Sequence, residues 1–562
     1  MLATKEQNFQ MNKLSDKSAS SFETCHVRRV ALRALAPLFI LGGLTLTGCA
    51  VGPDYVRPGV ETPAAFKEAA ARGTEGVAVA PDSTAVAPAS TLAGPTVPRY
   101  SPPATPSTAA AGMSWRPAQP NDAAALGKWW EIFGDAQLNS LVEQVELSSQ
   151  TVAQAEAQFR LARAQLDSAR AAEWPDLSLN GSITRSGRGS SSSVVSTSTT
   201  SASLASGSSR TSTDRSASLG VSWEVDVWGR LRRQAESRFA ATEASAADLA
   251  AARLSVQSDL AIAYFKLRIV DAQKELYDST LAGYRKSVEL TTNRYKGGVA
   301  ARADVVQAET QLKSTQVQAI DLDTQRAQLE HAIALLIGKP ASDFSIPQSP
   351  LHPNRTELPT IPSAGIPSEL LQRRPDIAGA ERRVAAANAA IGVAKAAYFP
   401  SLSLSASGGY SSPSFANWIS APNRFWSIGP DLALSLFDAG ARRAATRQAE
   451  ASYDASVAEY RQTVLTGFRE VEDYLAQLRI YELEAEAQAD ALESARQSLA
   501  LVTNQYKAGI VSYLNVISAQ AAALSSERNS ADILGNRFSA TVLLIKALGG
   551  GWDSADVGAS LK

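Results

Sequence analysis

Alternating apolar and polar residues predict a β-strand in a chain whose other periodic segments are helical. In the stretch YFPSLSLSASGGY, residues 398–410, Leu402 and Leu404 alternate with serines. A period of two is typical of a strand with one apolar and one polar face. A single strand leaves its backbone donors and acceptors unpaired, so further strands are expected elsewhere in the chain.

The missing strands emerge when the chain is compared with itself. EWPDLSLNGS at 173–182 matches residues 398–407, and TNRYKGGV at 292–299 matches TNQYKAGI at 503–510, so the chain is an internal duplication. Each half predicts two strands with one apolar face. The apolar positions are Leu177, Leu179, Ile183, Leu219, Val221, Trp223, Val225 and Val227 in the first half, and Leu402, Leu404, Trp426, Ile428, Leu432, Leu434 and Leu436 in the second.

Two interpretations fit this alternation, a membrane barrel and a soluble sandwich. Tryptophan and tyrosine residues near the strand ends favour the barrel, as do long loops at one end. Those aromatic residues are Trp174, Trp228, Tyr398, Tyr410 and Trp426. The loop of the first hairpin, expected over residues 186–215, is rich in serine and threonine and should be solvated, and its counterpart over 411–423 is shorter.

Two long segments follow a heptad repeat instead of an alternation. In the first, the repeat is expected at Leu249, Val256, Leu260, Ala263, Leu267, Val270, Tyr277, Leu281, Tyr284, Val288 and Tyr295. Residues 230–295 contain no proline and predict a helix about 100 Å long, and the second half repeats the pattern from about 441 to 506. Each rod reverses at a glycine turn, at Gly297 and Gly298 or at Gly509, and an amphipathic helix returns over about 302–336 and 513–548. The patterns together predict an α+β fold.

Four strands per chain leave two open edges, and an open edge cannot face lipid because its amides find no water there. Several copies must therefore share one barrel. Two copies give eight strands, whose interior side chains would fill, whereas three copies give twelve strands and room for a lumen. The polar face of serine, asparagine, aspartate and glycine suits a wet lumen. The closure argument requires several copies and does not by itself fix three.

The N-terminal residues predict export and a lipid anchor. Arg28, Arg29 and Arg33 precede an apolar run, ALAPLFILGGLTLT, that is too short to span a bilayer but suits a signal peptide. The run ends in LTGCA, which resembles the lipobox of bacterial lipoproteins, in which Cys49 becomes the acylated first residue. An ordinary signal peptide with an incidental cysteine is the alternative. Lipoproteins retained in the inner membrane often carry Asp where this chain has Ala50, so the outer membrane is expected.

Composition argues against several functions. The formal net charge is -1, which provides no basic field for nucleic acid. Three histidines are scattered without metal-ligand spacing, and the motifs HExxH, GxSxG and the Walker loop do not occur. We therefore expect no enzyme activity, no cofactor and no metal.

Four motifs, in order, resemble the outer-membrane factor lipoproteins of the TolC superfamily, NodT type. They are CAVGPDYVRPGVETPAAF (49–66), WWEIFGDAQLNSLV (129–142), WEVDVWGRLRR (223–233) and RRPDIAGAERRVAAANAAIGVAKAAYFPSLSL (373–404). The resemblance implies an α+β membrane protein, a trimer whose 12-stranded outer-membrane β-barrel, four strands per chain, continues into a long periplasmic α-helical barrel. It also implies a duct docked on a periplasmic adaptor (membrane fusion) protein and an inner-membrane resistance-nodulation-division pump.

The resemblance also implies site residues. The adaptor-docking tips would be Gly298, Val299 and Ala300 on one hairpin and Gly509, Ile510 and Val511 on the other. The periplasmic aperture would involve Asp304, Tyr506, Asn515 and Ser518, where many relatives carry acids at the last two positions. Plain turns at the tips, and a helix-start role for Asp304, are the simpler alternatives.

The expected organisation follows from these patterns. It comprises a lipoprotein signal peptide (1–48), a lipid-anchored segment (49–66), an Ala/Pro-rich flexible insert (67–114), a first structural repeat (115–340), a Pro-rich connection in the equatorial region (341–366), a second repeat (367–550) and a C-terminal tail (551–562). The expected function is the exit duct of a drug-efflux system. A type I protein-secretion duct and a coiled-coil lipoprotein that transports nothing are the rivals, and the strands argue against the second of these.

Overall fold

The computed structural model of the protein divides into two compact units, Met1–Cys49 and Ala50–Lys562. The structure describes residues 50–60, 62–63, 66–68, 128–188, 210–352, 359 and 370–552, all in the second unit. The expected signal peptide, Cys49 and nearly all of the expected Ala/Pro-rich insert lie outside the described residues.

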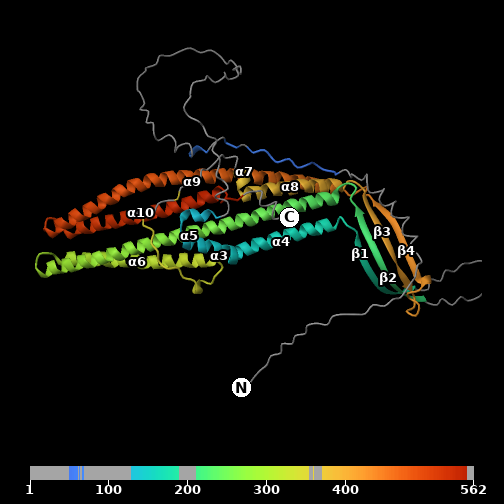
Figure 1. The fold of residues 1–562 in the computed structure, drawn as a ribbon, viewed down its shortest axis with the longest axis horizontal. Helices are drawn as coiled ribbons and strands as arrows, with labels where there is room; N and C mark the ends of the chain where they lie inside the picture. Colours follow the sequence, from blue (N-terminus) through green and yellow to red (C-terminus); the bar gives the residue numbers. More distant parts are fainter. Residues whose placement is uncertain are drawn as a thin grey trace, which may run out of the picture. The chain divides into compact units, whose positions relative to one another are not determined.

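The described chain is mostly helical and contains one small antiparallel sheet (Figure 1). Its elements, in order, are η2 (Trp129–Phe133), α3 (Ala136–Ser148), α4 (Gln150–Ala171), β1 (Asp176–Arg188), β2 (Arg210–Val225), α5 (Arg230–Lys296), α6 (Arg302–Leu336), η3 (Ala341–Asp343), α7 (Leu370–Arg373), α8 (Pro375–Ala396), β3 (Ser401–Ser412), η5 (Ala421–Asn423), β4 (Arg424–Ala433), α9 (Ala441–Lys507) and α10 (Tyr513–Ala547).

The same run of elements occurs twice. A helix, a β-hairpin, a very long helix and a returning helix appear first as α4, β1, β2, α5 and α6, and then as α8, β3, β4, α9 and α10. Helices α4 and α8 have 22 residues each, α5 and α9 have 67 each, and α6 and α10 have 35 each. The two halves of the duplicated sequence therefore build matching helices.

The four strands form one sheet in the order β1-β2-β3-β4, and every neighbouring pair is antiparallel. The four-strand prediction is confirmed, with small corrections at the strand ends. Strands β1 and β2 stay paired out to Arg188 and Arg210, so they extend well into the stretch expected to be a loop from residue 186 to 215. Val227, Leu434 and Leu436 lie beyond the strands, because the chain turns there toward the next helix.

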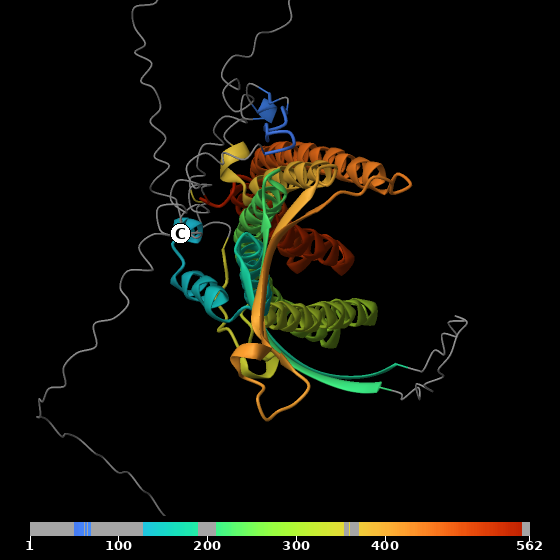
Figure 2. The same ribbon diagram turned by 90° about the vertical axis from the view of Figure 1, so that its right-hand side faces the viewer.

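The long helices pack side by side as one layer. Helix α5 packs against α4 and α8 near the sheet and against α6 and α10 farther from it, and α9 packs against α8 and α10. The order across the layer is thus α4 or α6, then α5, then α8 or α10, then α9, as Figures 1 and 2 show. Because α4 leads into β1 and β4 leads into α9, the helix layer and the sheet end at the same two edges.

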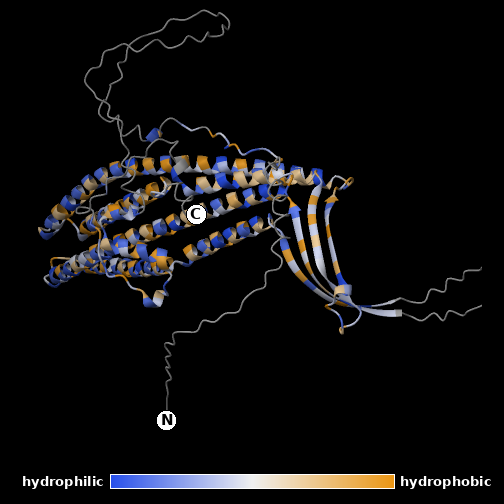
Figure 3. Ribbon diagram, turned by 45° about the vertical axis from the view of Figure 1, so that its right-hand side comes forward, coloured by the Kyte–Doolittle hydropathy of each residue, from blue (hydrophilic) through white to orange (hydrophobic). Residues whose placement is uncertain are grey.

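The helices bury their heptad positions between neighbours. Among the predicted heptad residues of α5, the buried ones are Val256, Leu260, Leu267, Val270, Tyr277, Leu281 and Tyr284. Tyr295, also expected in the repeat, is largely exposed because α5 ends one residue later. Figure 3 shows hydrophobic and hydrophilic residues alternating along the helices. Within the described residues, no helix is sufficiently long and apolar to span a bilayer.

The segment that begins at Ala50 is extended and lies along α8 and α9. The Val51 N–H donates to the Trp228 carbonyl at 3.1 Å, and Asp54 pairs with Arg233 at 2.9 Å. Farther along, Phe66 is 1% exposed, in a core cluster with residues of α8, α9 and α10. The segment therefore starts where β2 meets α5 and ends against the middle of α9.

Candidate functional site

The sheet has two chemically different faces, because paired residues of neighbouring strands point to the same side. The polar face carries Asp176, Ser178, Asn180, Ser182, Asp214, Ser216, Ser218, Ser222, Glu224, Ser403, Ser405, Ser407, Ser411, Ser427 and Asp431. Hydroxyl pairs join the strands across this face: the Oγ atoms of Ser182 and Ser216 lie 2.8 Å apart, as do those of Ser407 and Ser427. This face is suited to contact with water.

The opposite face, called here the apolar face, consists mainly of large hydrophobic side chains. It carries Leu177, Leu179, Ile183, Leu219, Val221, Trp223, Val225, Leu402, Leu404, Ala406, Tyr410, Trp426, Ile428, Pro430 and Leu432. Most of them are exposed within the single chain, with Leu179 at 76% and Ile428 at 71%. Exposed apolar area on this scale requires a cover, either lipid or protein.

The junction between strands and helices is rigidly built. The Glu224 carboxylate accepts two hydrogen bonds from Arg230, at 2.9 and 2.6 Å, and the Trp228 ring stacks on Phe399 with centroids 4.7 Å apart. At the start of α9, the Asp438 carboxylate accepts from the Arg442 side chain and from the backbone N–H of Gly440 and Arg442. These contacts, the Arg442 side chain first, lower the pKa of Asp438 to about 2. A cavity of about 360 Å³ lies at this junction.

The turns at the far ends of the long helices share one geometry. Gly298 and Gly509 have φ angles of 74° and 78°, in the left-handed region that favours glycine. The Val299 N–H bonds to the Arg294 carbonyl and the Ile510 N–H to the Gln505 carbonyl, both at 2.9 Å, as in a Schellman motif.

The predicted tip residues lie in these two turns. The side chains of Val299 and Ile510 are 69% and 73% exposed. Ala300 is half-buried, and Val511 packs against the cluster around Tyr506 and Tyr513. Two bare apolar side chains at the ends of the hairpins are consistent with a surface that a partner covers.

The predicted aperture residues lie in two environments. Tyr506 is buried against Tyr513, with ring centroids 5.2 Å apart, and burial together with the nearby charge of Asp304 raises the pKa of Tyr506. Burial also raises the pKa of Tyr513 to about 12. Asn515 and Ser518 are exposed on α10, and the Ser518 hydroxyl donates to the Leu514 carbonyl of its own helix at 3.1 Å.

Arg294 is the tip residue that the sequence interpretation missed. Its guanidinium lies over the Tyr506 ring, 4.8 Å from the centroid, and donates to the Lys507 carbonyl at 2.9 Å. It therefore joins the end of α5 to the end of α9. Its position at the matching site of the duplication, where the other half has Gln505, is the only signal in the sequence that set it apart.

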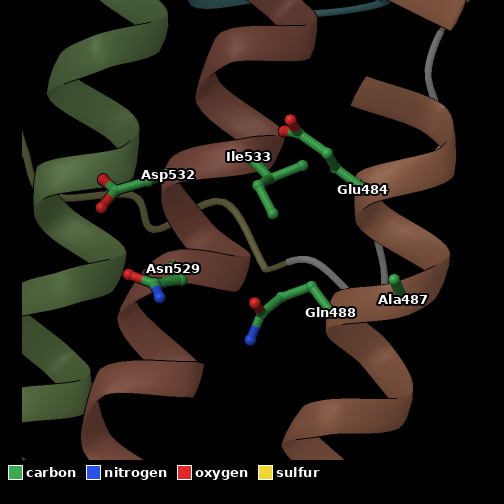
Figure 4. A pocket seen from close by; sticks show the side chains of 6 residues that line it. All are labelled: Glu484, Ala487, Gln488, Asn529, Asp532 and Ile533. Atoms are coloured by element: carbon green, nitrogen blue, oxygen red, sulfur yellow. The ribbon is translucent and has the colours of Figure 1, made fainter. Parts of the chain in front are cut away.

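A shallow groove lies between α9 and α10, and it is lined by Glu484, Ala487, Gln488, Asn529, Asp532 and Ile533 (Figure 4). Its volume is about 450 Å³, and its carboxylates, Glu484 and Asp532, lie on different helices. Asp532 already accepts a hydrogen bond from Gln273 at 2.6 Å. Within the part of the chain that the structure describes, no group of three or more His, Cys, Asp or Glu side chains could hold a metal ion.

Comparison with protein families identifies the fold. Residues 141–339 and 366–550 match the family described as outer membrane efflux protein. The chain belongs to the outer membrane efflux protein family. The two matched ranges correspond to the two halves of the duplication, so the whole repeated unit is typical of this family.

Two relatives illustrate the similarity in sequence. The chain is 32% identical over 463 residues to "Probable efflux pump outer membrane protein TtgC" of Pseudomonas putida, which covers 81% of this chain and 92% of that protein. It is 30% identical over 486 residues to "Nodulation protein T" of Rhizobium leguminosarum bv. trifolii, covering 86% of this chain and 90% of that protein. The predicted resemblance to the NodT type is confirmed.

Solved structures agree with the sequence comparison. The outer-membrane channel OprN superposes with a TM-score of 0.73 at 28% identity, covering 90% of this chain and 100% of that one. VceC of Vibrio cholerae gives a TM-score of 0.68 at 28% identity, covering 76% and 99%. The fold of this family member is therefore that of outer-membrane channels, and the predicted α+β class is confirmed.

Proposed function

We propose that three copies of this chain form the outer-membrane exit duct of a tripartite efflux system, through which small toxic compounds leave the cell. The observation that carries the proposal is the four-stranded sheet with one polar face, one exposed apolar face and two open edges. Such a sheet is stable in a bilayer only when further copies close it into a barrel. The names of the relatives as efflux pump outer membrane proteins support the same function.

The edges of the chain support a ring of identical copies. Strand β1 and helices α4 and α6 form one edge, and β4 and α9 form the other, so one copy meets the next head to tail. Heterologous contacts of this kind form a closed ring when the rotation from one copy to the next divides a full turn evenly. Exposed apolar side chains along the edge helices, among them Leu161, Val317 and Leu501, would be covered by the neighbouring copy.

Three copies suit the width of the duct. Three sheets of four strands make a barrel of twelve strands, wide enough for a lumen, whereas two make eight, which side chains fill. The polar face would line that lumen, and the helix layers would continue it into the periplasm. The duct moves compounds passively and carries out no chemistry.

The hairpin turns are proposed to dock on a periplasmic adaptor protein that connects the duct to an inner-membrane resistance-nodulation-division pump. The exposed Val299 and Ile510 support this proposal, together with the backbone of Gly298, Ala300, Gly509 and Val511. Asp304, Tyr506, Asn515 and Ser518 are proposed to surround the periplasmic aperture, because they lie within about two turns of these tips.

Cys49 is proposed to carry a lipid anchor in the outer membrane. The residue that follows it, Ala50, lies against Gly229 at the strand–helix junction, near the end of the apolar face. An acyl chain starting there would reach the bilayer that the barrel spans. Incorporation of a palmitate analogue by the wild type and its loss in Cys49→Ala test the anchor.

Closure of the ring is tested by disulfide cross-linking between β1 and β4. Both native cysteines, Cys25 and Cys49, precede the strands in sequence. Cysteines are therefore introduced at Ser178 on β1 and at Ser427, Gly429 or Asp431 on β4. We expect covalent dimers and trimers in outer membranes and no larger species. As a control, cysteines at Ser178 on β1 and Ser405 on β3, which are on the same face but would not be on adjacent strands in the ring, should give no cross-link between chains.

The same strains report the activity. The wild-type chain should restore drug resistance to a host that lacks its own duct but keeps its adaptor and pump. After oxidation, the cysteine variants should still assemble as trimers. Ladders that extend beyond trimers would contradict the closed ring of three. Export of a protein substrate in place of drugs would instead support a type I secretion duct.

A further inference from the structure

Acidic residues of the strands occur on only one face of the sheet. The acidic residues of the strands, Asp176, Asp214, Glu224 and Asp431, all lie on the polar face. On the apolar face the described charged side chains are arginines only: Arg185 on β1, Arg215 on β2 and Arg424 on β4. A face that meets hydrocarbon has no use for charge, so these three cations need an explanation.

The three arginines gather at one end of the apolar face. In the register of the sheet, the row of Leu179, Leu219 and Trp426 is uncharged, and Arg424 lies in the next row, beside Tyr410. Arg215 occupies the row after that, opposite Ile183, and Arg185 the following one. This end of the sheet lies away from the helices, since β1 runs outward from α4 (Figure 1). The arginines therefore border the hydrocarbon-facing rows on the far side.

Contacts within the described part of the chain do not neutralise the positive charge of these arginines. Arg424 and Arg185 are exposed, and among the described residues neither forms an ion pair. Arg215 is held in place: its guanidinium lies over the Phe415 ring, 4.5 Å from the centroid, and donates to the Pro413 carbonyl. None of these contacts supplies a negative charge.

Closure of the ring would add to the positive charge. If β1 of one copy pairs with β4 of the next, Arg185 and Arg424 of different copies come to lie on adjacent strands, on the same face and at the same end. Like charges on neighbouring strands repel one another. A bound anion between them would remove that repulsion.

We propose that Arg185, Arg215 and Arg424 bind the phosphate groups of phosphorylated lipids in the outer leaflet of the membrane. The inference rests on the proposed barrel. A guanidinium can donate two parallel hydrogen bonds to one phosphate, and its apolar stem can lie against neighbouring acyl chains. The exposed Phe415 of the adjoining loop, whose ring the Arg215 guanidinium covers, provides an apolar surface beside Arg215 for the same lipid. The occupant is a phosphate at the level of the headgroups, attached to a hydrophobic tail.

The test is a titration of the full-length trimer in detergent with diphosphoryl lipid A, followed by native mass spectrometry. The double variant Arg185→Gln/Arg424→Gln should bind this lipid about tenfold more weakly or worse, since charge-assisted hydrogen bonds are lost. Arg185→Lys/Arg424→Lys should retain part of the affinity. Arg285→Gln, an exposed arginine on α5 about 80 Å along the helix from the sheet, should bind like the wild type.

Three results would overturn the proposal. The first is equal binding of dephosphorylated lipid A, and the second is unchanged binding by the double glutamine variant. The third is competition by inorganic phosphate at the same concentration as the lipid, because such competition would indicate a site for free anions. Conductance of the same preparations in planar bilayers separates this proposal from the duct itself. The double variant should still form pores, whereas a wild type that forms none would contradict the proposed function.

Discussion

At the scale of single residues, buried charge distinguishes this chain more than its surface ion pairs do. Asp271 on α5 is 4% exposed and accepts hydrogen bonds from Arg268 at 3.1 Å, from Arg326 at 2.9 Å and from the Ser349 N–H at 3.0 Å. Arg268 also donates to Gln137 at 2.6 Å. One carboxylate thus ties α5 to α6, to the start of α3 through Arg268, and to the segment after η3.

Asp271→Ala should destabilise the protein strongly, because it leaves Arg268, which is almost fully buried, without a counter-charge and leaves Arg326 paired with Glu330 alone. Loss of one partner of a buried pair costs about 3–5 kcal/mol. Heat- or denaturant-induced dissociation and unfolding of the purified trimer measure the change. Asp473→Ala is the matched control, since its pair with Arg469 at 3.8 Å is exposed and should contribute at most about 1 kcal/mol.

An equal loss in both variants would contradict the dominance of the buried group.

Asp271 illustrates a limit of sequence-based prediction. The heptad repeat, which includes the preceding residue Val270, predicts α5 as a helix, but Arg326 and Ser349 are 55 and 78 residues away from Asp271 in sequence. No local pattern connects them.

At the scale of elements, most of the architecture was readable from local patterns. The returning helix expected over 302–336 is α6, Arg302–Leu336, because the glycine turn before it and the apolar period within it are local signals. The sequence patterns do not predict that the extended segment after Cys49 lies along α8 and α9. It has no periodicity of its own, and its anchor points, such as Arg233 for Asp54, are distant in sequence.

The turn elements carry the next prediction, that the tips bind an adaptor through exposed apolar side chains. Val299→Asp and Ile510→Asp should each weaken cross-linking to the adaptor and lower drug resistance, and the double variant should abolish both. The backbone of the turns should survive, because the glycines that adopt positive φ are untouched. Trimer abundance in the outer membrane should therefore stay normal.

Ile419→Asp is the control for the tips. Ile419 is 77% exposed, like Ile510 at 73%, but it lies in the β3–β4 loop at the opposite end of the repeat. This variant should cross-link to the adaptor as the wild type does. Full resistance in the double tip variant, with normal cross-linking, would place the docking surface elsewhere on the helices.

At the scale of the whole molecule, the duplication and the proposed ring multiply each residue in different ways. The match of 292–299 with 503–510 continues along the returning helices, so Asp304 on α6 corresponds to Asn515 on α10. In a ring of three copies each position occurs three times. The first half of the repeat therefore supplies an acid near the aperture, while the second supplies an uncharged amide.

The final prediction concerns ion preference at the aperture. Asn515 and Ser518 are exposed, three residues apart on α10, on the side opposite the buried Tyr513 and Val516. If this side faces the lumen, three copies place six uncharged polar groups there, and the hydroxyl proton of Ser518 is already used within its helix.

The wild-type duct should then show weak cation selectivity in planar bilayers. Asn515→Asp or Ser518→Asp should raise cation selectivity and block by divalent cations, because each creates a ring of three negative charges around a narrow bore. The effect should be largest at low salt, where screening is least. Glu493→Gln, on α9 about four turns from the tip, serves as a control for charge changes outside the aperture. A wild type that is already strongly cation-selective, and that the new acids leave unchanged, would show that another ring sets the selectivity or that α10 turns a different side to the lumen.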